Sequence, residues 1–121
     1  MTDIVARIPI IKLYDNLIVS IQTALSDQVV LQLKDDIANK IDQTGANGLV
    51  VDISGVEIMD SYISRAIRDI ALIAKLMGVR TVISGMDALV AISLVEMGLS
   101  LPGVEAVLNL ETAIERLSGK E

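Results

Sequence analysis

The side chains available for chemistry are limited, because the 121 residues include no histidine and no cysteine. Histidine bases, thiol nucleophiles, disulfides and the common zinc sites are therefore excluded. The reactive types that remain are Ser, Thr, Asp, Glu, Lys, Arg and Tyr, and several of them fall in one segment, residues 52–61, with the sequence DISGVEIMDS. It carries the carboxylates of Asp52, Glu57 and Asp60 and ends on Ser61. Residues 52–61 are therefore a candidate functional site.

Carboxylate chemistry is one interpretation of the segment. Three carboxylates can hold Mg²⁺, although acids in a loop more often face solvent or cap a helix. Asp52 near a strand end is also typical of a phosphoacceptor, but receiver domains need a lysine after a late strand. Here Ser84-Gly85 and Asn109-Leu110 follow the late strands. The nucleotide-binding patterns GxxxxGK[ST] and GxGxxG do not occur. We therefore expect no metal, no cofactor and no catalytic residue.

Ser61 is the stronger candidate, as the target of another enzyme. It follows Asp60 at an expected helix start, where free N–H groups and the helix dipole favour a phosphate. With no histidine and no nearby lysine to activate it, Ser61 is a poor nucleophile but a suitable kinase substrate. The alternative is that Asp60-Ser61 is only a capping pair. Ser84, after a later strand, is a weaker second candidate for modification.

The elements that must position these residues alternate along the chain. Strands are predicted at 7–13, 17–21, 49–53, 81–83 and 106–108, and helices at 26–44, from 60 or 61 to 77, 88–97 and 110–117. The order ββαβαβαβα predicts an α/β fold, in which a hairpin precedes three strand–helix units in a mixed central sheet. Residues 49–53 form an apolar run with one acid near its end, which is typical of a central strand covered on both faces.

The composition of the chain limits the classes of partner that it can bind. The net charge of −6 and the scattered basic residues argue against nucleic acid and acidic membrane surfaces. No apolar run approaches the roughly 18 residues of a membrane span, and the N-terminus does not read as a signal peptide, so we expect a cytoplasmic protein. Hydrophobic residues make up 52% of the chain, which favours self-association or assembly. The helix 88–97 is apolar all round, so either the fold or a partner subunit should cover it.

Segment 52–61 resembles the signature of STAS domains, the family of anti-sigma-factor antagonists. That signature places an acid at a strand end, then a polar residue, a short loop, and Asp-Ser opening a helix; the predicted element order agrees with the family. The resemblance covers nearly the whole chain, which implies a stand-alone STAS domain over 1–121. Segments 8–14, 44–48 and 75–78 resemble the stressosome group of the family. Tyr62-Ile63 after the serine also fits that group, since common antagonists have small residues there.

The resemblance implies a function without catalysis. Ser61 would be the phosphorylated residue, and Asp60, Tyr62 and Ser64 would contact partners. The partners would be RsbR-type scaffold proteins in a large complex, an RsbT-type serine kinase that leaves when Ser61 is phosphorylated, and a phosphatase that resets the serine. The alternative is an ordinary antagonist that binds its kinase or anti-sigma factor one to one. The size of the assembly separates the two.

Overall fold

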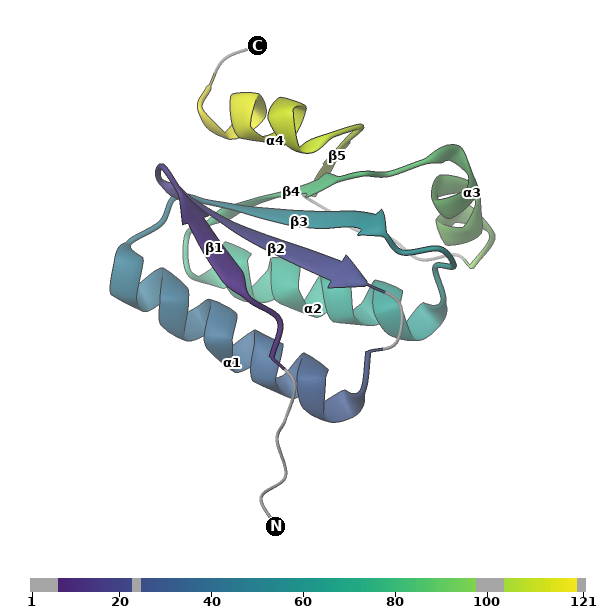
Figure 1. The fold of residues 1–121 in the computed structure, drawn as a ribbon, viewed down its shortest axis with the longest axis horizontal. Coiled ribbons are helices and arrows are strands. Elements are labelled where there is room, and N and C mark those ends of the chain that lie inside the picture. Colours follow the sequence, from purple (N-terminus) through teal and green to yellow (C-terminus); the bar gives the residue numbers. More distant parts are fainter. Residues whose placement is uncertain (1–6, 23–24, 98–103, 120–121) are drawn as a thin grey trace.

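The fold is described from a computed structural model for residues 7–22, 25–97 and 104–119 (Figure 1). The elements follow the predicted order ββαβαβαβα. The strands are β1 (Ile10–Leu13), β2 (Asn16–Gln22), β3 (Gly48–Gly55), β4 (Arg80–Ser84) and β5 (Glu105–Val107), and the helices are α1 (Asp27–Thr44), α2 (Ser61–Leu76), α3 (Ala88–Glu96) and α4 (Leu110–Leu117). A membrane-spanning helix is absent from this described part of the chain.

The five strands form one mixed sheet in the order β1-β2-β3-β4-β5. β1 pairs antiparallel with β2, and the other neighbours are parallel, as the hairpin and the strand–helix units predict. Helices α1 and α2 cover one face and α4 covers the other (Figure 1). β3 lies in the middle, with Leu49 and Val51 facing α1 and α2 and Val50 facing α4. The prediction of a central strand covered on both faces is confirmed.

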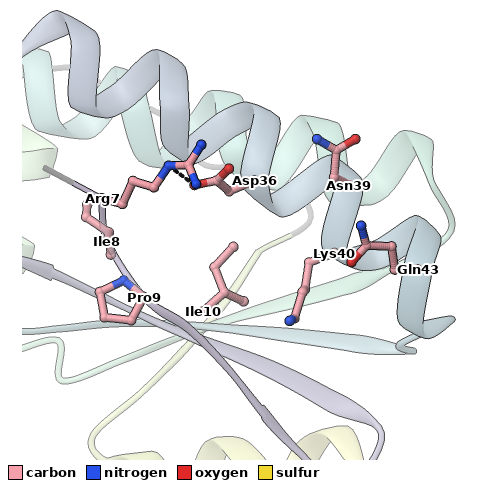
Figure 2. A pocket seen from close by; sticks show the side chains of 8 residues that line it. All are labelled: Arg7, Ile8, Pro9, Ile10, Asp36, Asn39, Lys40 and Gln43. Carbon is pink, nitrogen blue, oxygen red and sulfur yellow. Dashed lines mark ion pairs between the residues drawn. The ribbon is translucent and has the colours of Figure 1, made fainter. Parts of the chain in front are cut away.

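The first strand is shorter than predicted. Arg7 to Pro9 lie outside β1, whose pairing with β2 begins at Ile10 opposite Val19. Proline has no N–H to donate to a ladder, so the strand starts after Pro9. Residues 7–10 and α1 instead border a hollow of about 350 Å³. Arg7 faces Asp36 there (Figure 2), and the Arg7 Nε lies 3.9 Å from the Asp36 Oδ2.

The long helix α1 forms where its sequence provides a start, an apolar stripe and a stop. The Ser26 side chain accepts a hydrogen bond from the Val29 N–H at 3.2 Å, as an N-cap does. The stripe recurs at the helical period and is buried against the sheet: Val30, Leu33, Ile37 and Ile41. Gly45 ends the helix in the left-handed conformation, with a φ of +66°.

The later helices are less deeply buried than the sequence predicts. In α3 only Val90 and Leu94 are buried, whereas Leu89, Ile92 and Val95 are 65%, 54% and 78% exposed. The described fold therefore leaves one apolar face of α3 open.

In α4, Ala113 is buried, and Ile114 and Leu117 pack against the cluster on that face of the sheet. Leu110, the first residue of α4, is 39% exposed. Met77, which directly follows the last residue of α2, is 39% exposed.

Candidate functional site

The connection between β3 and α2 holds the acid-rich segment at one edge of the sheet. β2, β3 and β4 are parallel, so their carboxyl ends meet at this edge, where ligands and partners commonly bind in open α/β sheets. Val56 and Met59 are buried and anchor the connection to the core. Between them, Glu57 and Ile58 face solvent, and Ile58 is 71% exposed.

Asp60 is the N-cap of α2. Its Oδ1 accepts a hydrogen bond from the Ile63 N–H at 2.8 Å, which satisfies one of the free donors at the helix start. Ser61 is the first residue of α2, and its side chain is exposed. The capping role expected of this pair is therefore performed by Asp60, and the hydroxyl of Ser61 is accessible to a second protein.

Tyr62 ties the start of α2 to the start of α1. Its hydroxyl donates a hydrogen bond to Oδ1 of Asp27 at 2.8 Å. This hydrogen bond, with smaller contributions from burial and from the negative charge of Asp27, raises the pKa of Tyr62 above its usual value. The contact fixes the ring next to Ser61, so Asp60, Ser61 and Tyr62 lie together at the helix start.

Ser64 does not join this surface. Its side chain is 2% exposed, and its hydroxyl donates to the Asp60 backbone oxygen at 2.9 Å. The prediction that Ser64 contacts a partner is wrong for this fold. The buried face of α2 includes small residues such as Ser64 and Ala66 as well as its isoleucines.

Asp52 connects the ends of two strands. Its Oδ1 accepts a hydrogen bond from the Ser84 hydroxyl at 2.8 Å, and its Oδ2 accepts one from the Ser54 hydroxyl at 2.7 Å. Ser84 is fully buried, so the suggestion that a kinase modifies it is wrong for the folded chain. The parallel register, which places Asp52 opposite Ser84, is the signal that could have revealed this contact.

Gly85 brings the connection after β4 against this same region. Its φ is +84°, and a Cβ added to it would lie 2.7 Å from the Ser54 nitrogen. The residue that follows β4 therefore packs closely against the end of β3, just before the β3–α2 connection. Asp52, Glu57 and Asp60 do not converge on a metal, since the described ranges contain no group of three acidic side chains suited to hold one.

A shallow hollow of about 430 Å³ between α1 and α2 adjoins Tyr62. Lys34 and Asp69 form an ion pair across it at 2.9 Å, and Arg65 lines it from α2. Sequence reasoning did not predict this hollow, because helical periodicity identifies the face toward the sheet and not the contact between neighbouring helices.

Known proteins resemble this chain over most of its length. Residues 7–113 match the model of the STAS domain. RsbS from Moorella thermoacetica, solved with a serine-to-glutamate substitution, superposes with a TM-score of 0.81 at 38% identity over 94% of this chain and 97% of that chain. A chain in the solved structure of the stressosome, a signal integration and transduction hub, superposes with a TM-score of 0.82 at 39% identity. The match covers 92% of this chain and 96% of that chain.

A protein of Bacillus subtilis strain 168, the uncharacterized YezB, is 33% identical over 69 residues, which are 57% of this chain and 70% of that protein. The family model covers both the sheet and the β3–α2 connection that carries Asp60 and Ser61. The chain thus belongs to the STAS domain family, and the predicted STAS fold is confirmed.

Proposed function

We propose that this chain is a non-enzymatic scaffold and antagonist of a stressosome-type complex, which holds an RsbT-type serine kinase and releases it when Ser61 is phosphorylated. The observation that carries the proposal is the exposed serine at the first residue of a capped helix, in a chain about as similar to RsbS as to a stressosome component. The proposal includes RsbR-type scaffold proteins as assembly partners, a phosphatase that resets Ser61, and a cytoplasmic location.

The surface around Ser61 suits a protein partner. Asp60 and Tyr62 flank the serine, and Ile58 adds an exposed apolar side chain on the same connection. A phosphate adds about 1.5 to 2 negative charges, directly after Asp60 and four residues after Glu57 in the sequence. That charge would repel an acidic partner, or leave a desolvated phosphate in a packed interface. The expected effect of phosphorylation is therefore loss of the interface with the fold intact.

The Moorella relative offers a parallel. That RsbS was solved with glutamate in place of a serine, a substitution that adds negative charge as a phosphate does. The likeness supports control through a serine in this chain, and Ser61 is the serine at the edge of the sheet whose exposure and helix position suit that control.

Incubation of the purified chain with its kinase and ATP is expected to label Ser61. Ser84→Ala should be labelled as strongly as the wild type, because the hydroxyl of Ser84 is buried, while Ser61→Ala should lose nearly all of the label. Intact-mass spectrometry measures the phosphate and peptide mapping locates it. Equal labelling of Ser61→Ala and wild type would exclude Ser61 as the modified residue.

The exposed face of α3 is expected to support assembly. Leu89 and Val95 project from the helix without covering neighbours in the described fold, so Leu89→Gln with Val95→Gln should reduce association without loss of stability. Leu76→Gln removes a similarly exposed leucine at the end of α2 and serves as the control. Light scattering, with and without a scaffold homologue, gives the particle mass.

A large particle that forms with the homologue fits the scaffold role. A wild-type chain that stays monomeric in both conditions contradicts the assembly and favours an antagonist that binds one to one.

A further inference from the structure

The arginines of this chain are nearly all paired with carboxylates. Four of the five form ion pairs within the described residues: Arg7 with Asp36, Arg68 with Asp69, and both Arg80 and Arg116 with Glu105. Arg65 is the exception among the described arginines, and it is exposed on α2. An exposed guanidinium without an acidic partner is free to bind an anion that arrives later.

Arg65 lies one helical turn after Ser61. Residues four apart on a helix share a face, and helical side chains lean toward the N-terminus, so the Arg65 side chain points back over Ser61. Its Nε–H donates a hydrogen bond to the Ser61 backbone oxygen at 3.3 Å. The guanidinium is therefore held beside the residue whose hydroxyl faces solvent.

Neighbouring acids are already engaged by other groups. Asp69, one turn further along α2, is the natural partner for Arg65, but Lys34 from α1 occupies it at 2.9 Å. Asp27, which lines the same hollow, accepts the hydroxyl of Tyr62. These contacts between α1 and α2 account for why Arg65 has no carboxylate partner.

We propose that Arg65 holds the phosphate of phosphorylated Ser61, as a guanidinium that binds a phosphomonoester dianion from one turn along the same helix. The proposal rests on the proposed function, because it requires a phosphate on Ser61. Arginine suits the role because its planar fork donates two parallel hydrogen bonds to phosphate oxygens. Arg65 would then fix the direction of the phosphate and offset the repulsion from Asp60 and Glu57.

The binding also links the modification to the hollow between α1 and α2. Arg65 lines that hollow in the unmodified chain, together with Tyr62 and Lys34. A guanidinium that turns toward the phosphate leaves this lining. Phosphorylation would therefore alter two adjoining surfaces, the start of α2 and the groove beside it, without moving the backbone.

The test is a phosphorus NMR titration of the full chain, with phosphoserine installed at position 61 during translation. The second pKa of phosphoserine is ordinarily about 6. Arg65→Gln should raise it by about 0.3 to 0.5 pH unit relative to the wild type, since the arginine favours the dianion. Arg65→Lys, which keeps the charge and loses the fork, should give an intermediate value.

Lys75→Gln is the matched control, because it removes one positive charge from the same helix. Lys75 lies about 21 Å along α2 from Ser61, well beyond the screening length of about 8 Å in physiological salt, so its removal should leave the titration unchanged. Equal pKa values in Arg65→Gln and Lys75→Gln would overturn the proposal. Glutamine is a good helix former at an exposed position, so the variant should stay folded.

The titration and the kinase experiment fail independently. Because the phosphate is installed without a kinase, the titration reports on Arg65 even if no kinase labels Ser61. Conversely, a chain labelled at Ser61 whose titration ignores Arg65 retains the proposed function and loses only this inference.

Discussion

Ser61→Asp is expected to weaken kinase capture by about tenfold or more, equivalent to about 1.4 kcal/mol, whereas Ser61→Ala should retain it. The reason is local and electrostatic. An aspartate at this exposed position adds a carboxylate directly after Asp60 and four residues after Glu57, in the surface that we propose the kinase covers. A single aspartate carries less charge than a phosphate, so authentic phosphoserine should have the larger effect. Binding titrations with the purified kinase measure the affinities.

The matched control is Asn39→Asp, which adds the same charge at an exposed position of α1, in the lining of the other hollow. Kinase affinity should not change in this variant. The midpoint temperature of thermal unfolding of Ser61→Asp should match or exceed that of the wild type, because acids in the first turn stabilise a helix by about 0.3–1 kcal/mol. An unfolded Ser61→Asp protein would make the effect structural, and equal losses in both variants would point to total charge.

Gly85→Ala is expected to cost about 3 kcal/mol of unfolding free energy, more than any other glycine-to-alanine change at a positive φ in the described chain. The methyl group would meet the Ser54 backbone at 2.7 to 2.9 Å, and the backbone would keep a φ of +84° that disfavours any Cβ. Gly78→Ala has a similar φ of +79° and nothing within 4 Å, so it should cost only the conformational part, about 1 kcal/mol.

Urea unfolding measures the unfolding free energy of the two variants, which can be compared when the slope of free energy against urea concentration is the same in both. The difference between their unfolding free energies isolates the steric cost of a methyl group between Gly85 and the Ser54 backbone. Equal losses in Gly85→Ala and Gly78→Ala would show that the backbone accommodates the methyl group without cost, and would contradict the tight packing of Gly85 against Ser54.

The fold was predictable because its signals are local. The caps at Ser26, Asp60 and Asp87 each accept a backbone N–H three residues on, as the sequence pattern indicates. The apolar run 49–53 and the hairpin turn fix the centre and one edge of the sheet. The family signature also placed the candidate site on the β3–α2 connection, with Asp60 and Ser61 together.

The contacts between elements were not predictable in the same way. From the sequence, Ser64 is a polar residue three positions after Ser61 and is expected at the partner surface. In the fold, α2 packs against both the sheet and α1, so the small side chain of Ser64 is buried. Ser84 reads as a loop serine, but the parallel register brings it to Asp52. Arg65 was not singled out at all, because its lack of a partner depends on Lys34 from α1, 31 positions earlier in the sequence, occupying Asp69.

Under the proposed function, the position of Ser61 on a helix that is already formed would set the timing of the response. The helix is fully built in the unmodified chain: Asp60 caps it, one face of α2 is buried, and Tyr62 donates a hydrogen bond to Asp27. Under the proposed function no segment has to order or melt when the phosphate arrives, so no slow conformational step follows the chemistry. The delay between signal and output would then equal the time for phosphoryl transfer plus the lifetime of the kinase complex. Resetting would take the time for removal of the phosphate plus the time for the kinase to bind again.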